Sequence, residues 1–142
     1  PGLTIQRASR AAHIPSDRRL RAWARAALAR PATVTIRYVA ATEARRLNRD
    51  HRGRDYPTNV LTFVYSARPL AGDIVICAPV VAREAREQGK SVDAHHAHLL
   101  VHGLLHLQGL DHETHKLAAA RMERRERAIL AVLGFADPYG ER

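Results

Sequence analysis

Three histidines in the last third of the chain have the type and spacing of metal ligands. His102 and His106 are four residues apart, so on a helix of 3.6 residues per turn their imidazoles lie on the same face, one turn apart. Gly109 follows three residues later, where a helix can end in the left-handed conformation that glycine adopts most easily. The chain can then turn back and bring His112 to the same ion. The pattern therefore predicts one zinc ion per chain, bound by His102, His106 and His112.

The chemistry expected of such an ion is hydrolytic. The spacing H-x3-H-x2-G-x2-H matches the metzincin zinc pattern, in which three neutral imidazoles leave a fourth coordination position open. The glutamate that serves peptidases as general base is absent, because Gly103 stands in its place. Peptidase activity is therefore disfavoured. A glycine inside a helix costs about 1 kcal/mol relative to alanine, which indicates that backbone or substrate comes close there.

Other histidines crowd the same region, since seven of the nine fall within residues 95–115. An alternative triad of His98, His102 and His106 would lie along one helix face. Three rings spread over two turns converge poorly on one ion, so His98 is predicted to be a neighbour of the site. We expect the remaining three at the surface or beside the ligands: His95, His96 and His115.

The second nitrogen of each ligand imidazole also needs a partner. Metal-bound histidines usually donate their other N–H group to a carboxylate, a carbonyl or water. Asp111 and Glu113 are close to the ligands in the sequence and are candidates for this role. Both could equally stabilise a helix terminus, where the helix dipole favours a carboxylate.

The elements that must position these residues follow an α+β order. Its length of 142 residues, with 46% hydrophobic and 26% charged residues, predicts a single globular domain over 1–142. The expected elements are strand 3–7, helix 17–30, strand 34–38, helix 42–49 capped by Thr42, an exposed loop over 48–59, an antiparallel hairpin of strands 60–65 and 73–77, and helices 79–88, 91–108 and 114–133. This order predicts a small mixed four-stranded sheet packed with about five helices, with the metzincin-like three-His zinc site on helix 91–108.

Apolar residues indicate which faces are buried. Leu20 and Trp23 mark the core side of helix 17–30. Cys77 lies in an apolar run and is expected to be a buried thiol. The core side of the last helix is predicted to carry Leu117, Met122, Ile129, Leu130 and Leu133.

Charge and cysteine content narrow the class of partner and the compartment. The 23 Lys and Arg against 14 Asp and Glu give a formal charge of +9, which favours polyanions as partners. An arginine-rich proteome would give the same composition, so charge alone leaves nucleic-acid binding open. One cysteine cannot form an internal disulfide, so a cytoplasmic location is the default. No stretch approaches the roughly 18 to 20 apolar residues that span a bilayer, and no signal-peptide core is evident, so no membrane association is expected.

Three segments resemble one protein family. Residues 102–112 match the H-G-x-L-H-L-x-G-x-D-H signature of the bacterial YbeY proteins, which are zinc-dependent endoribonucleases. Residues 52–61 resemble the family's R-x-K-D-x-P-T-x-V-L segment, and residues 72–74 match its G-D-I sequence. The departures are Arg54 for the usual Lys, Thr62-Phe63-Val64 for Ser-Phe-Pro, and Leu110 for a frequent Tyr. None of them removes a metal ligand.

The resemblance implies a substrate and partners. It implies a single-strand-specific endoribonuclease acting in maturation of the 16S ribosomal RNA 3′ end and in ribosome quality control, with the small ribosomal subunit as partner and no small-molecule cofactor. The alternative is a ribosome-assembly RNA-binding protein with a mainly structural zinc. The cleavage site, protein partners and oligomeric state stay open, as does the physiological metal, since three imidazoles also bind copper and nickel.

Arg52 is the candidate catalytic residue for phosphodiester cleavage. A guanidinium can stabilise the charge that develops on a phosphoryl group, although Arg52 could instead pair with Asp55 or only position a phosphate. Asp73 either faces the site or begins a strand. Thr58 and Asn59 either contact substrate or form a turn.

Overall fold

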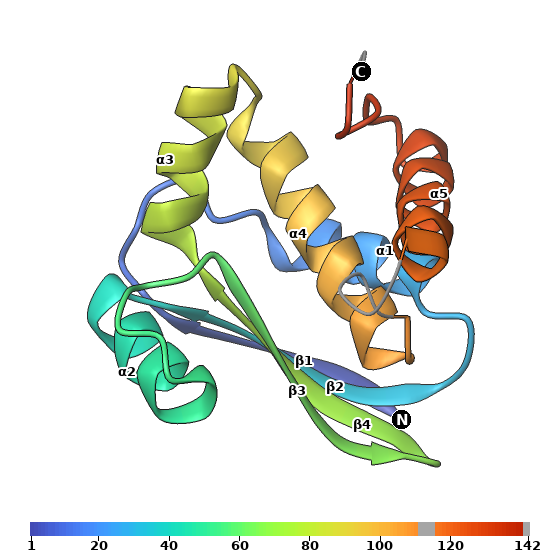
Figure 1. Cartoon of the computed structure of the whole chain (residues 1–142), viewed down its shortest axis with the longest axis horizontal. Coiled ribbons are helices and arrows are strands. Elements are labelled where there is room, and N and C mark those ends of the chain that lie inside the picture. The colour runs from blue at the N-terminus through green and yellow to red at the C-terminus, as the bar shows by residue number, and fades with distance from the viewer. Residues whose placement is uncertain (111–115, 141–142) are drawn as a thin grey trace.

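The computed structural model describes residues 1–110 and 116–140, and in these ranges it has four strands and five helices (Figure 1). In chain order they are β1 (Gly2–Ala8), α1 (Asp17–Ala27), β2 (Ala32–Val39), α2 (Ala41–Arg52), β3 (Val60–Ala67), β4 (Leu70–Cys77), α3 (Ala78–Gln88), α4 (Val92–Leu107) and α5 (Lys116–Val132). The predicted α+β class is confirmed. No helix in these ranges is long and apolar enough to cross a membrane.

The four strands form one mixed sheet in the order β1-β2-β4-β3. β2 is parallel to both of its neighbours, β1 and β4. β3 pairs with β4 antiparallel, as the predicted hairpin requires, with an irregularity between Val64 and Ser66. β3 is consequently an edge strand that runs beside the strand carrying the Gly-Asp-Ile sequence.

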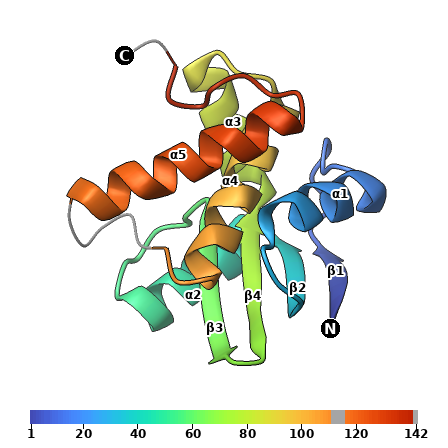
Figure 2. The same cartoon turned by 90° about the vertical axis from the view of Figure 1, so that its right-hand side faces the viewer.

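The two faces of the sheet are covered by different helices. Successive residues of a strand point to opposite faces, and on β4 Ile74 belongs to the main core with α1 and α4, whereas Val75 belongs to a second core with α2. α2 therefore lies on the face opposite to α4, as Figure 1 shows. α5 packs across α4 (Figure 2).

Two glycines allow α4 to lie close to the sheet. A Cβ atom on Gly103 would lie 3.2 Å and 3.3 Å from side-chain carbons of Ile74 and 3.4 Å from Oγ1 of Thr62. A Cβ atom on Gly72 would lie 2.3 Å from the carbonyl oxygen of Phe63 and 2.5 Å from Cδ1 of Leu107. The close approach predicted at Gly103 is thus between the helix and the sheet. Any larger residue at this position would need Ile74 or α4 to shift by a few tenths of an ångström.

Several element boundaries differ from the prediction. α2 begins at Ala41, with Ala40 and not Thr42 at its N-cap, and it continues to Arg52. It ends at Gly53, whose φ of 70° places it in the left-handed region and whose N–H group bonds to carbonyls of the last turn. The predicted loop over 48–59 is therefore wrong for residues 48–52. α1 ends at Ala27, a few residues before the predicted end, because Leu28 is already extended.

Burial of the helices follows the prediction except at one end. Leu20, Trp23, Cys77, Met122, Ile129 and Leu130 are buried, as predicted. Leu133 packs against the core in part. Leu117 is 73% exposed, so its prediction as a core residue is wrong. Leu117 lies in the first turn of α5, before the buried positions of that helix begin.

Candidate metal centre

The C-terminal end of α4 has the turn that the three-histidine pattern requires. Gly109 has a φ of 100°, in the left-handed region, and its N–H group donates to the carbonyl of His106 at 3.0 Å. The N–H group of Leu110 donates to the carbonyl of Leu105 at 3.1 Å. The chain therefore leaves the helix sharply, directly after the second predicted ligand. His112, Asp111, Glu113 and His115 lie outside the described residues.

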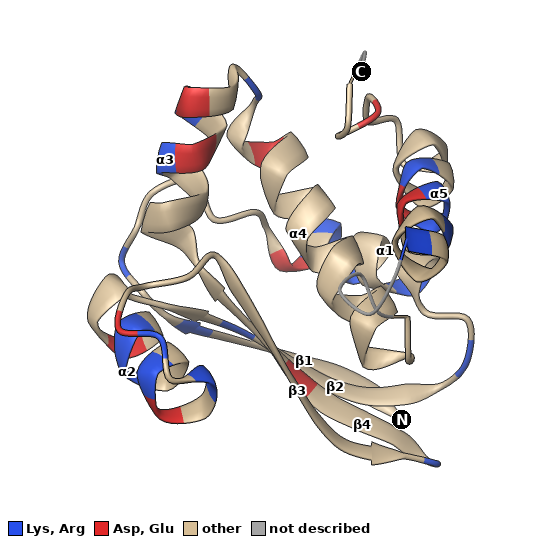
Figure 3. Ribbon diagram, viewed as in Figure 1, with Lys and Arg blue, Asp and Glu red and all other residues tan. Residues whose placement is uncertain are grey.

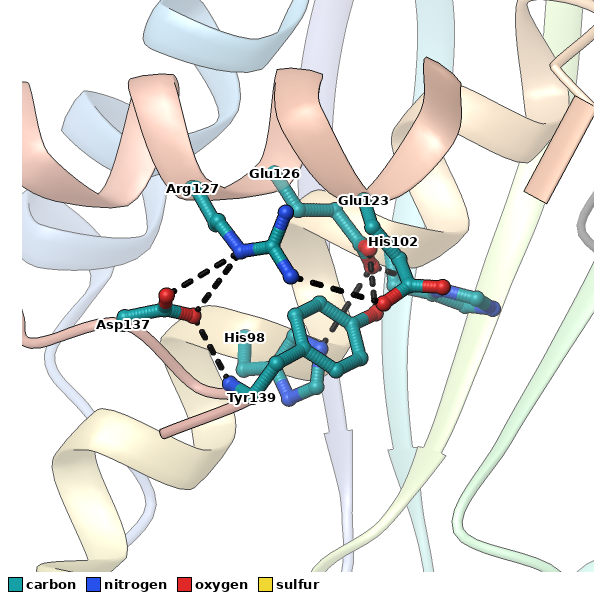
Figure 4. Close-up of polar contacts among 7 residues, drawn as sticks. All are labelled: His98, His102, Glu123, Glu126, Arg127, Asp137 and Tyr139. Atoms are coloured by element: carbon teal, nitrogen blue, oxygen red, sulfur yellow. Dashed lines mark hydrogen bonds and ion pairs between the residues drawn. The ribbon is translucent and has the colours of Figure 1, made fainter. Parts of the chain in front are cut away.

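His102 is held by a buried carboxylate. Its Nδ1 lies 2.7 Å from Oε1 of Glu126 on α5, and the Glu126 side chain has no exposed surface, whereas that of His102 is 30% exposed (Figure 4). A carboxylate accepts hydrogen bonds when ionised, so Nδ1 of His102 carries the proton. Nε2 is then the nitrogen with a lone pair available for a metal.

His106 is oriented in the same way by a different acceptor. Its Nδ1 lies 3.1 Å from the carbonyl oxygen of Leu110, and its side chain is exposed. A carbonyl oxygen can only accept, so Nδ1 again donates and Nε2 has the lone pair. Both imidazoles thus have the tautomer of a histidine that binds a metal through Nε2, and their donor chemistry fits zinc.

Glu126 is the polar centre of this region. Besides His102, Nε2 of His98 lies 3.4 Å from its Oε1, and the hydroxyl of Tyr139 donates to its Oε2 (Figure 4). Burial alone would raise the pKa of Glu126, but the contacts with His102, His98 and Tyr139 outweigh burial and lower the pKa to about 2. Glu126 is therefore ionised at neutral pH. The position of His98 beside the ligands is as predicted.

Glu126 has the role that the sequence analysis gave to Asp111 or Glu113 as candidates. It is 24 residues from His102, so no local pattern connects the two. One signal was present in the sequence. Glu126 lies four residues after Met122 and three before Ile129, on the apolar face of a helix, where an unpaired carboxylate would be costly.

Two histidines near the start of α4 are buried, contrary to the prediction of surface or ligand-neighbour positions. Nε2 of His95 lies 2.9 Å from Oε1 of Glu84 on α3. Nδ1 of His96 lies 3.2 Å from the hydroxyl of Tyr38 on β2. Burial lowers the pKa of His96 to about 4, and it also lowers the pKa of His95. α3 and β2 cover this part of α4, so both rings are core residues.

Arg52 is not joined to the histidines by the contacts that the structure gives. It is the last residue of α2, and its side chain is exposed. The carboxylate of Asp55 binds Arg45, at 2.8 Å and 3.0 Å from Nε and Nη2. The partner that the structure gives for Asp55 among the described residues is thus Arg45.

The other candidates from the sequence lie away from the histidine pair. Asp73 shares the sheet face of Val75, opposite to α4, and accepts a hydrogen bond from the hydroxyl of Tyr65. Asn59 donates to Oε1 of Glu84 at 3.0 Å, and its own Oδ1 accepts from the N–H group of Val60. Asn59 thus fixes the start of β3. Among the described residues, no three His, Cys, Asp or Glu side chains form a group that could hold a metal.

Comparison with known proteins identifies the family. The chain matches the profile described as "Endoribonuclease YbeY" over residues 6–134. The chain belongs to the YbeY family. The family predicted from the signature motif is thereby confirmed.

Individual relatives agree with the YbeY assignment. Endoribonuclease YbeY of Aromatoleum aromaticum is 57% identical over 141 residues, which cover 96% of this chain and 91% of the relative. Endoribonuclease YbeY of Methylibium petroleiphilum is 56% identical over 133 residues, covering 93% and 88%. The solution structure of TM1509 from Thermotoga maritima aligns with a TM-score of 0.57 at 23% identity, covering 99% of this chain and 100% of that one. This last likeness supports the fold.

The YbeY signature can now be related to the geometry of this chain. Its first two histidines are the pair whose Nδ1 atoms are held by Glu126 and by the carbonyl of Leu110. Its first glycine, Gly103, keeps α4 against the sheet. Its second glycine, Gly109, turns the chain after the helix. The G-D-I sequence places Gly72 where the side chain of Leu107 packs.

Proposed function

We propose that this chain is a metal-dependent endoribonuclease that hydrolyses RNA phosphodiester bonds, with one zinc ion bound by His102, His106 and His112. The observation that carries the proposal is the common tautomer of His102 and His106. Each has its Nδ1 hydrogen-bonded to an acceptor of the protein, which supports Nε2 as the atom that would bind the metal. The names of the relatives, which are endoribonucleases, support the reaction.

A bound zinc ion would polarise a non-bridging phosphate oxygen and lower the pKa of a bound water toward about 7. Within the protein, Glu126 holds the His102 ring and its proton in place. Gly103 leaves no carboxylate beside the first ligand, so a protein general base of the peptidase type is missing at that position. The guanidinium of Arg52 is proposed to stabilise the charge that develops on the phosphoryl group.

Charge supports RNA as the substrate. The formal charge is +9, and Figure 3 shows Lys and Arg gathered on α2 and α5. We propose single-stranded ribosomal RNA as the substrate, in maturation of the 16S 3′ end and in ribosome quality control on the small subunit in the cytoplasm. Arginines at exposed positions on these two helices are Arg45, Arg46, Arg49, Arg52, Arg121, Arg124 and Arg125.

The test combines metal analysis with cleavage of a defined single-stranded RNA. His106→Ala is expected to lose both zinc and cleavage, since it removes a ligand. Arg52→Glu is expected to keep zinc and to lose at least about 100-fold in cleavage, the size of effect seen when one charge-stabilising group is removed. Arg18→Glu, which makes the same charge change on α1, is the control and should retain most activity.

The outcomes separate the proposal from the alternative of an RNA-binding protein with a structural zinc. Full cleavage by metal-free His106→Ala would contradict the metal-dependent reaction. If wild-type protein binds zinc and RNA without cleaving, and unfolds when zinc is removed, the structural alternative is correct. Unchanged cleavage by Arg52→Glu would remove Arg52 from the mechanism.

A further inference from the structure

The segment that follows α5 turns back and places one side chain against the polar centre around Glu126. The hydroxyl of Tyr139 donates to Oε2 of Glu126, while Nδ1 of His102 donates to Oε1 (Figure 4). The two oxygens of one fully buried carboxylate are thus divided between a predicted metal ligand and a tyrosine from the C-terminal segment.

Tyr139 is itself fixed by several contacts. Its N–H group donates to Oδ1 of Asp137 at 2.9 Å, and Asp137 is paired with Arg127, whose Nε lies 3.0 Å from Oδ2. The guanidinium carbon of Arg127 lies 5.2 Å from the centre of the Tyr139 ring. The ring also packs edge-on against His98, with centroids 5.4 Å apart. These contacts hold the ring in the position from which its hydroxyl reaches Glu126.

The shared carboxylate couples the tyrosine to the imidazole. A carboxyl group rotates as one plane, so a donor that fixes Oε2 also fixes the direction in which Oε1 accepts. Hydrogen bonds to a buried carboxylate are charge-assisted and stronger than neutral ones. Loss of the tyrosine hydroxyl would let the plane of Glu126 turn and would loosen the orientation of the His102 ring.

We propose that Tyr139 is a positioning residue of the metal centre, acting through Glu126 to hold the Nε2 atom of His102 toward the metal. The proposal rests on the metal site under "Proposed function". Tyr139 lies outside residues 6–134, the range that matches the family profile. It also lies outside the signature motif at residues 102–112.

The experiment compares two tyrosine hydroxyl deletions in the full chain. Tyr139→Phe removes the donor to Glu126, and Tyr65→Phe removes a matched donor to Asp73 on the far face of the sheet. Zinc affinity is measured by competition with a chelator. Removing an outer partner of a ligand typically costs about 10- to 100-fold in metal affinity, and Tyr139 acts one step further out, so we expect a loss of about 3- to 10-fold. Tyr65→Phe should bind zinc like the wild type.

A second readout uses the metal-free protein. Nitrogen chemical shifts of the His102 ring report its tautomer, and Tyr139→Phe is expected to reduce the population with the proton on Nδ1. In a Glu126→Gln background, Tyr139→Phe should have much less effect on zinc affinity, because the shared carboxylate is gone.

The failure of this inference differs from the failure of the proposed function. If wild-type protein and Tyr139→Phe bind zinc equally well while His106→Ala does not, the inference is overturned and the metal site stands. If the wild type binds no zinc, the metal site fails, and the tautomer measurement decides the inference alone. Unchanged ring shifts in Tyr139→Phe would then overturn it.

Discussion

Two carboxylate–histidine pairs flank α4, and their burial is reversed. In the pair near the helix start, the His95 side chain is 4% exposed and that of Glu84 is 26% exposed. In the pair near the helix end, Glu126 is fully buried and His102 is 30% exposed. The burial of the two residue types is therefore exchanged between the pairs. The histidine is the more buried partner near the helix start, and the glutamate is the more buried partner near the helix end.

The reversal distinguishes a structural histidine, His95, from a predicted ligand, His102. Nε2 of His95 is used by Glu84, and among the described atoms its buried Nδ1 has no hydrogen-bond partner. Glu84 also accepts from Asn59, so this pair ties α4 to the start of β3. In His102 it is Nδ1 that Glu126 holds, and the side chain is 30% exposed. A buried anion behind an exposed ring is the arrangement that suits a metal ligand.

Removing the carboxylate of Glu126 is expected to give the largest effect. Glu126→Ala leaves His98, His102 and Tyr139 without a shared acceptor in a buried site, and the free energy of unfolding should fall by about 3 kcal/mol. Zinc affinity should fall by about 10- to 100-fold. Urea unfolding and chelator competition measure the two quantities. The control Glu126→Gln should recover part of the stability and little of the zinc affinity. A normal zinc affinity in Glu126→Ala would contradict the role of Glu126 in orienting a metal ligand.

His96 extends the comparison to a histidine on α4 with a neutral partner. Burial lowers its pKa to about 4, with a smaller opposing effect of Asp93 and a further lowering by His95. Below the unfolded pKa of about 6.5, His96 binds a proton in the unfolded chain but stays neutral in the folded chain. The part of the free energy of unfolding that depends on neutral His96 is therefore fully present above pH 6.5. It is lost as the pH falls toward 4, by about 3 kcal/mol in total.

Unfolding by urea between pH 7 and pH 4 measures this loss. His96→Gln keeps an acceptor for the Tyr38 hydroxyl but has no titrating ring, so its stability should fall less steeply with decreasing pH. His13→Gln, at an exposed position, is the control. An equal slope for His96→Gln and wild type would contradict a neutral, buried His96.

Glu84 should give the smallest effect and should act on stability alone. Glu84→Ala leaves buried His95 and Asn59 without their acceptor, so the free energy of unfolding should fall by about 1 to 2 kcal/mol. Zinc affinity should stay at the wild-type value, because the pair has no contact with His102. A loss of zinc affinity comparable to that of Glu126→Ala would show that the two pairs are not distinct.

Local patterns were sufficient for the helix that carries the ligands. The four-residue spacing of His102 and His106 predicted their common helix, and Gly109 predicted the turn that follows it. The hairpin of β3 and β4 also follows from local turn residues. Gly53 was an equally local stop signal, and the polar composition of residues 48–52 was wrongly given more weight than the glycine that ends α2.

Residues that act across the fold could not be predicted in the same way. Glu126 and Tyr139 reach His102 only because α5 packs on α4 and the chain then turns back, and neither event has a spacing signal. His95 and His96 have no spacing signal, so the sequence predicts them only at the surface or beside the ligands. Their burial depends on α3 and β2, which are distant in the sequence. The partners of a candidate site therefore need tertiary structure, whereas spacing alone can indicate which residues are candidate ligands.

The close packing of α4 on the sheet at Gly103 has a consequence for protein engineering. A single substitution, Gly103→Glu, would complete the metzincin peptidase sequence pattern in this chain. In this protein a Cβ atom at this position would lie 3.2 Å from a side-chain carbon of Ile74, so Ile74 or the helix would have to shift by a few tenths of an ångström. An exchange meant to introduce the carboxylate of a peptidase would therefore also change the contact between α4 and the sheet.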